Sequence, residues 1–183
     1  SLHGGLRFVI HDSLRAAGHE VDLCDLYAEG FDPVLPAAAR ERYFDPARNR
    51  EGVESYIERL FAAEALVLCF PVWCFGPPAI LKGWMDRVMI PGVSFRLDER
   101  GVMHPNLTHL KRVVAVTTYG RDRLGSWWIG DPPRKMVTRY LRWFVARDAD
   151  VRYVALYGIH RALEKRHDAF VARVRDALAG SNP

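Results

Sequence analysis

The sequence is poor in cysteine and lacks the common motifs of metal-dependent and serine-dependent enzymes. Its three cysteines, Cys24, Cys69 and Cys74, are an odd number without paired metal-ligand spacing. We therefore expect free thiols and a reducing, cytoplasmic environment. The seven histidines show no H-E-x-x-H spacing, and no G-x-S-x-G, G-x-G-x-x-G or Walker loop is present. These absences argue against metal catalysis and against an α/β-hydrolase.

The chain also lacks a hydrophobic run that could cross a membrane. Its longest charge-free run, 65–81, is interrupted by Pro71, Gly76, Pro77 and Pro78, so it cannot form one spanning helix. No signal-peptide pattern is present. The excess of 26 basic over 22 acidic residues is modest and dispersed, so nucleic acid is not an expected partner. The length predicts a single domain over residues 1–183.

Helical and strand periodicities alternate along the chain, which predicts an α/β protein. Apolar residues recur at helical spacing at about 2–14, 52–63, 78–89, 133–146 and 162–179. Short alternating or continuous apolar runs predict strands at 20–24, 65–70, 112–118 and 151–157. A small β-hairpin is expected where 93–97 and Val102 flank the turn 98–101. Buried strands that alternate with helices indicate a doubly wound parallel sheet with helices on both faces.

The predicted element order starts with a helix, although doubly wound folds normally start with a strand. The sequence also begins with Ser1 and not with methionine. We therefore expect an initial strand, and the loop that follows it, to be missing from the chain. The alternative is that four strands make the complete sheet.

Two loops follow predicted strands, and ligands of open α/β sheets bind at the carboxyl ends of strands. The first loop, 70–78, is rich in aromatic residues and proline: Trp73 and Phe75 offer flat apolar faces, and backbone amides can donate to a heteroaromatic edge. Packing between subunits is the alternative role of this loop. The second loop, 117–125, offers hydroxyl groups and glycines that suit a planar polar ligand.

The motif F-P-V-W-C-F-G-P-P-A-I-L-K-G-W-M-D-R-V at 70–88 closely resembles the signature of the NAD(P)H:quinone oxidoreductases with a flavodoxin-like fold. Further resemblance covers 16–21, 25–27, 30–33, 94–101 and the pair Thr117–Thr118, hence most of residues 1–130. The resemblance implies a flavin, FMN or FAD, that carries electrons from NAD(P)H to a quinone. It also implies a homodimer with the active sites at the subunit interface.

The resemblance also implies which residues hold the flavin. One wall of the ring site falls on the first loop and the opposite wall on the second. The residues concerned are Pro71, Val72, Trp73, Cys74, Phe75, Thr117, Thr118, Tyr119 and Gly120. The family commonly has an aromatic residue where this chain has Cys74, and often glycine where it has Tyr119. We expect Tyr119 to donate a proton or a hydrogen bond to the quinone.

The phosphate-binding loop of the family follows its first strand, so Ser1 and His3 are not equated with phosphate ligands. Trp127 and Trp128 precede 131–133 in a predicted loop, where we expect one of them to cover the substrate pocket or both to be packing residues.

The identity of the natural electron acceptor, which is a quinone, an azo compound or a nitroaromatic, stays open. Two other functions remain: a flavin-bearing regulatory subunit of a potassium-efflux system, and an electron-shuttling flavodoxin. The basic pI of about 9.1 argues against the shuttle.

Overall fold

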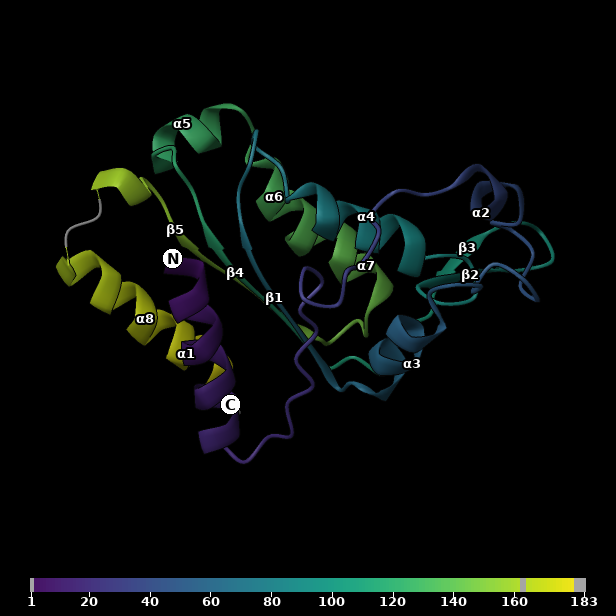
Figure 1. Cartoon of the computed structure of the whole chain (residues 1–183), viewed down its shortest axis with the longest axis horizontal. Coiled ribbons are helices and arrows are strands. Elements are labelled where there is room, and N and C mark those ends of the chain that lie inside the picture. The colour runs from purple at the N-terminus through teal and green to yellow at the C-terminus, as the bar shows by residue number, and fades with distance from the viewer. Residues whose placement is uncertain (1, 162–163, 180–183) are drawn as a thin grey trace.

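The computed structural model describes residues 2–161 and 164–179, which form a parallel sheet covered by helices (Figure 1). The sheet contains β1 (Ala65–Pro71), β4 (Arg112–Thr118) and β5 (Asp150–Leu156), in the order β1-β4-β5. Both strand pairs are parallel and run in register over seven residues. The carboxyl ends of the three strands therefore meet at one edge of the sheet.

Helices pack on both faces of the sheet (Figure 1). Helices α1 (Leu2–Ala16) and α8 (Glu164–Ala179) lie side by side on one face, where Leu6, Phe170 and Val174 join a buried cluster with β4. A larger cluster fills the opposite face. Its helical members come from α3 (Glu54–Ala62), α4 (Ala79–Val88), a π-helical segment (Met136–Leu141) that follows α6 (Pro132–Lys135), and α7 (Arg142–Phe144).

The remaining elements are short. They are α2 (Ala37–Glu41), the antiparallel hairpin strands β2 (Phe95–Leu97) and β3 (Met103–Pro105), α5 (Arg123–Trp128) and a 3-10 turn (Ile159–Arg161). The hairpin lies at the end of the molecule far from α1 and α8 (Figure 1). It confirms the predicted hairpin insert.

The apolar patterns explain these positions. Strand β4 is central, and residues 113–118 are buried on both faces, as its continuous apolar run predicts. Helix α4 follows Pro78, whose fixed φ suits a helix start, and buries Leu81, Trp84, Met85 and Val88 at spacings of three and four residues. The flavodoxin-like α/β fold class predicted from the sequence is confirmed, and Trp84 belongs to the core.

One sequence prediction about the elements is wrong, and another is right in position but not in helix type. Residues 20–24 form no strand: they pair with no other strand of the described chain, and Asp22 instead forms an ion pair with Arg59 of α3 at 2.7 Å. An alternating pattern cannot make a strand without a hydrogen-bonding neighbour. The helix expected at 133–146 is a succession of α6, the π-helical segment and α7. Periodicity alone does not reveal such a widened turn.

The three cysteines are unpaired in the structure, as predicted. Among the described residues, no helix combines the length and the apolar character that a membrane crossing requires.

Candidate functional site

The structure brings the two predicted loops together at the carboxyl edge of the sheet. Pro71, the last residue of β1, lies opposite Thr118 of β4, and the Val72 N–H donates to the Thr118 carbonyl at 2.9 Å. The ladder between the strands therefore continues one residue into the aromatic loop. From there the chain turns back within four residues.

The aromatic turn, defined here as Trp73–Gly76, has an unusual backbone. Trp73 and Gly76 exchange two backbone hydrogen bonds of 3.0 and 2.8 Å, and the two residues between them, Cys74 and Phe75, have φ values of 47° and 58°. Residues other than glycine rarely adopt positive φ, and such strain concentrates at functional sites. The turn therefore holds a backbone shape that its residue types do not favour.

This conformation exposes the groups that a flat ligand needs. The Trp73 side chain is 65% exposed, although large aromatic side chains usually lie inside. The backbone N–H groups of Cys74 and Phe75, at the tip of the turn, donate to no other described residue. An apolar ring face and two free donors thus lie within one turn, an arrangement that suits a planar ligand with acceptors along one edge.

The residues that the resemblance assigns to the opposite wall lie at the end of β4 and directly after it. Thr117, Thr118 and Tyr119 are buried, with exposed fractions of at most 3%, and only Gly120 is exposed. The Tyr119 N–H donates to the Leu156 carbonyl at 2.8 Å, so β4 continues inward past its last strand residue. The side chains of these three residues therefore do not form an open wall for a ligand, because the strand carries them into the core.

Tyr119 is the centre of a buried hydrogen-bond network. Its hydroxyl donates to Asp131 Oδ1 at 2.6 Å and lies 2.5 Å from the Tyr153 hydroxyl, while Tyr157 donates to Asp131 Oδ2 at 2.9 Å. The Tyr119 hydroxyl has one hydrogen, which it donates in the hydrogen bond to Asp131. It therefore accepts the hydrogen bond from the Tyr153 hydroxyl. We call Tyr119, Asp131, Tyr153 and Tyr157 the tyrosine network. It joins the end of β4, strand β5 and the start of α6.

Burial raises the pKa of Tyr119, and the Asp131 and Tyr153 hydrogen bonds raise it further. Burial also raises the pKa of Tyr153 to about 12. In this structure the Tyr119 hydroxyl is committed to Asp131, and its expected role as donor to the quinone stays a prediction.

The sequence holds a partial indication of this network in the spacing of its tyrosines, although they belong to no recognised motif. Tyr153, Ala155 and Tyr157 are two residues apart and therefore share one face of β5. Asp131 has a positive φ of 45° at the start of α6, a conformation that aspartate tolerates better than most residues. Which partner each hydroxyl finds is a property of the tertiary structure.

Trp127 and Trp128 lie in a helix and not in the predicted loop. They end α5, whose N-cap residue Asp122 accepts a hydrogen bond from the Gly125 N–H at 2.7 Å. Their exposed fractions are 74% and 83%, so neither packs inside this chain, and a place above the substrate pocket or packing against another chain stays a prediction. Leu124 of the same helix is also exposed, which makes α5 an apolar surface patch.

Comparisons with known proteins identify the family of this chain. A family model described as a flavodoxin-like fold matches residues 4–179. The FMN-dependent NADH:quinone oxidoreductase of Pseudomonas savastanoi pv. phaseolicola is 30% identical over an alignment that covers 93% of this chain and 88% of that protein. The chain belongs to the flavodoxin-like quinone oxidoreductases.

Other relatives of this quinone oxidoreductase family are mammalian. The ribosyldihydronicotinamide dehydrogenase (quinone) of Pongo abelii is 32% identical over 66% of this chain. The match spans 58% of that protein, and about half of other mammalian relatives. Among solved structures, the NAD(P)H:quinone oxidoreductase from Methanothermobacter marburgensis superposes with a TM-score of 0.79 at 21% identity, covering 98% of this chain and 91% of that one. This last likeness concerns the fold.

The residues present fit the ring of FMN, the cofactor named for the Pseudomonas relative. An isoalloxazine is flat, with polar atoms on one edge. The aromatic turn offers an exposed indole and two unused N–H donors beside it. The exposed groups of this fit belong to Trp73, Cys74, Phe75 and Gly120, and the flavin contacts expected of Pro71, Val72 and residues 117–119 stay predictions.

Proposed function

We propose that this protein reduces quinones with NAD(P)H by means of bound FMN. The observation that carries the proposal is the aromatic turn, a strained and exposed structure at the carboxyl edge of a flavodoxin-like sheet. The Pseudomonas relative, named as an FMN-dependent NADH:quinone oxidoreductase, supports it because it aligns over nearly the whole chain.

In this proposal FMN, when bound, supplies the hydride chemistry, and the protein supplies position and polarity. Trp73 holds one face of the ring, and the N–H groups of Cys74 and Phe75 donate to its polar edge, where they stabilise negative charge. Gly120 borders the site without a side chain. The tyrosine network fixes the end of β4 and therefore the distance between the two loops.

We further propose that nicotinamide and quinone use the same open face in turn. Only one of them fits at a time, so the first product leaves before the second substrate enters. Initial-rate measurements should then give parallel double-reciprocal lines, the pattern of a ping-pong mechanism. Intersecting lines would contradict the shared face.

The apolar surface of α5 is the proposed contact of a homodimer. Leu124, Trp127 and Trp128 are each at least 74% exposed on one six-residue helix, and contiguous exposed apolar side chains often mark an interaction surface. Sedimentation of the wild type should give a dimer, and Trp128→Glu should shift it towards monomer. A monomeric wild type would contradict this contact.

The decisive experiment combines flavin binding with turnover. Trp73→Ala should weaken FMN binding about 30-fold, since a lost aromatic stack and its buried area amount to roughly 2 kcal/mol. Trp143→Ala is the matched control: Trp143 is also exposed, but it lies on α7, at the amino end of β5. Calorimetry with FMN and NADPH oxidation in the presence of menadione provide the two readouts. The proposal is wrong if the wild type neither binds FMN nor oxidises NADPH.

A further inference from the structure

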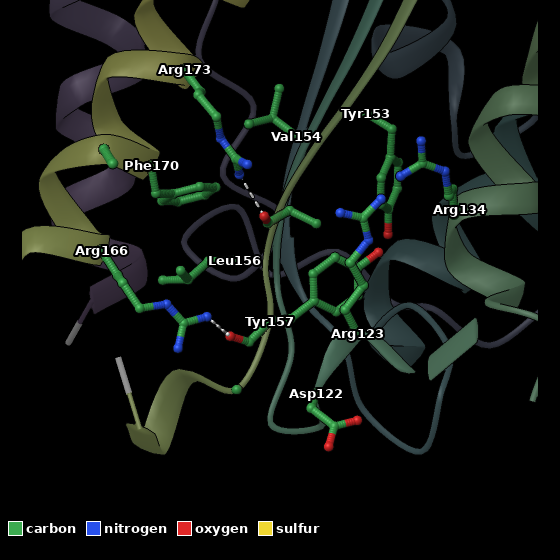
Figure 2. A pocket seen from close by; sticks show the side chains of 13 residues that line it. Asp122, Arg123, Arg134, Tyr153, Val154, Leu156, Tyr157, Arg166, Phe170 and Arg173 are labelled. Carbon is green, nitrogen blue, oxygen red and sulfur yellow. Dashed lines mark hydrogen bonds between the residues drawn. The ribbon is translucent and has the colours of Figure 1, made fainter. Parts of the chain in front are cut away.

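A cavity of about 700 Å³ lies along the outer edge of β5, beside the tyrosine network (Figure 2). Strand β5 ends the described sheet, with β4 on one side only. Helix α8 forms one wall of the cavity, and α5, α6 and the strand itself form the rest. Four arginines line it: Arg123, Arg134, Arg166 and Arg173.

These four arginines have no acidic partner among the described residues. Some arginines elsewhere pair with carboxylates, such as Arg59 with Asp22 at 2.7 Å and Arg152 with Asp150 at 2.8 Å, and others form no ion pair. What distinguishes the four is that they line one cavity. The acidic residue of the cavity lining is Asp122, whose carboxylate caps α5 and forms no ion pair with the described arginines. The cavity therefore holds an excess of positive charge, with the Asp122 carboxylate in its lining and the Asp131 carboxylate in the adjoining tyrosine network.

Two of the arginines have a structural role that accounts for part of this charge. Arg173 donates to the Ala155 carbonyl at 2.7 Å, and Arg166 donates to the Tyr157 carbonyl at 2.9 Å (Figure 2). They cover outward-facing carbonyls of an edge strand, a device that prevents pairing with other chains. A guanidinium carries five N–H groups, so each retains donors for a ligand.

The other two arginines have no such role. Arg123 forms no hydrogen bond or ion pair with a described side chain or backbone group, and Arg134 lies over the Tyr153 ring with its guanidinium carbon 5.4 Å from the ring centre. Figure 2 shows both beside Tyr153, on the side of β5 away from α8. Edge protection does not explain them, because they contact no β5 carbonyl.

The shape and the remaining lining indicate what kind of anion fits. A volume of about 700 Å³ is within the usual range for small-molecule sites and far exceeds a single phosphate ion. The half-buried rings of Tyr153 and Tyr157 supply flat surfaces next to the charges. Arginine binds phosphate in a bidentate manner, and aromatic rings accept a base or a ribose.

We propose that this cavity binds the phosphate groups of a nucleotide. The inference rests on the uncompensated arginines and not on the proposed quinone reduction. The nucleotide is either the NAD(P)H co-substrate, whose phosphates lie away from its reacting ring, or a separate nucleotide. Both share the same recognition chemistry, and competition distinguishes them.

The test is calorimetric titration of the full chain with ADP at low salt. We expect Arg123→Gln and Arg134→Gln each to weaken ADP binding about tenfold, since each removes charge-assisted hydrogen bonds. Arg147→Gln is the matched control, because Arg147 is exposed and lies outside the cavity; its affinity should stay within about twofold of wild type. Added salt should weaken wild-type binding, which tests the charge dependence without any substitution.

Other probes identify the part of the ligand that is bound. Adenosine should bind far more weakly than ADP; equal binding of the two would overturn the assignment to phosphate. Pyrophosphate should bind more weakly than ADP; equal binding would overturn the assignment to a nucleotide. The whole proposal fails if wild type does not bind ADP, or if the double variant Arg123→Gln/Arg134→Gln binds it as tightly as wild type.

NADPH distinguishes the two sources. If NADPH displaces ADP, and the double variant raises KM for NADPH at unchanged kcat, the cavity serves the co-substrate. If NADPH does not displace ADP, the cavity serves a separate nucleotide. A chain that binds ADP through these arginines but shows no quinone reduction would contradict the proposed function and support this site.

Discussion

The turns that follow β1 and β4 begin side by side and contain aromatic residues, yet they end in opposite environments. Trp73, after β1, is 65% exposed, whereas Tyr119, after β4, is 1% exposed. The difference begins in the backbone. Each chain forms one more ladder hydrogen bond past its strand, from Val72 to Thr118 and from Tyr119 to Leu156. The chain after β1 then turns back at Trp73–Gly76, whereas the Tyr119 carbonyl also accepts from the Ile159 N–H at 2.9 Å.

This comparison separates residues that present a surface to a ligand from residues that support it. Trp73 has an exposed ring and lies next to unused donors, so its loss should affect binding more than folding. Tyr119 has its hydroxyl committed to Asp131, so its loss should affect folding more than binding. Four predictions test this contrast.

The largest effect is expected at Gly83 of α4, the helix that follows the aromatic turn. A Cβ at this position would lie 2.2 Å from the Pro33 carbonyl oxygen and 2.5 Å from the Pro33 Cα, so backbone must move. Gly83→Ala should lower the free energy of unfolding by about 3 kcal/mol, measured by urea denaturation.

Gly5→Ala is the control for this substitution. Gly5 lies in α1, and nothing lies within 4 Å of the position of its Cβ. Alanine is the better helix former, so this variant should be as stable as wild type or up to about 1 kcal/mol more stable. A similar loss in both variants would show that the close approach of Pro33 is not the cause.

The next effect is expected at the tyrosine network. Tyr119→Phe removes a donor from Asp131 and an acceptor from Tyr153, and should lower the free energy of unfolding by about 2 kcal/mol. FMN affinity should change less than about threefold. Tyr27→Phe, at a 75% exposed tyrosine, should change stability by less than about 0.5 kcal/mol. A large loss of FMN binding at full stability would return Tyr119 to the ligand site.

A smaller effect should appear in alkaline solution. Tyrosines of the unfolded chain ionise near pH 10, whereas burial raises the pKa of Tyr153 in the folded protein to about 12. The folded state then holds more protons above pH 10, so stability is complete below pH 10 and falls as the pH rises towards 12. Urea denaturation at pH 9 and 11 should show this loss. Tyr153→Phe should reduce the loss by about 1 kcal/mol; an unchanged loss would contradict the role of Tyr153.

The smallest effect on stability is expected for a substitution at Trp73, where the effect on FMN binding should be large. Trp73→Ala, which should weaken FMN binding, should change the free energy of unfolding of the flavin-free chain by less than about 0.5 kcal/mol, since the ring is mostly in solvent. Thermal denaturation without FMN provides the measurement. A loss above about 1 kcal/mol would show that the indole is a packing residue, and the contrast with Tyr119 would disappear.

Local pattern predicted most of the elements but not all pairings. The run at 112–118 corresponds to β4 residue for residue, since its apolar centre at 113–116 has the continuous pattern of a strand buried on both faces. The alternation at 20–24 was misleading, because a strand depends on a neighbour that its own residues do not specify. The widened turn at Met136–Leu141 is invisible to periodicity for a similar reason.

The candidate site was predictable only in part. The motif at 70–88 located the aromatic turn, but the pair Thr117–Thr118 suggested open hydroxyl groups where the structure has buried side chains. The cavity arginines come from α5, α6 and α8, three segments that have no relation in the sequence. Their convergence could not be predicted, because it depends on how helices pack around the free edge of β5.

The sequence by itself determined the alternation of helices and strands, the apolar faces and the aromatic motif, because hydrophobic periodicity and residue type act locally. Tertiary structure alone decided that Trp73 faces solvent while Tyr119 is inside, and that four arginines share one cavity. Those outcomes depend on backbone direction beyond each strand and on contacts between distant segments, which no local pattern encodes.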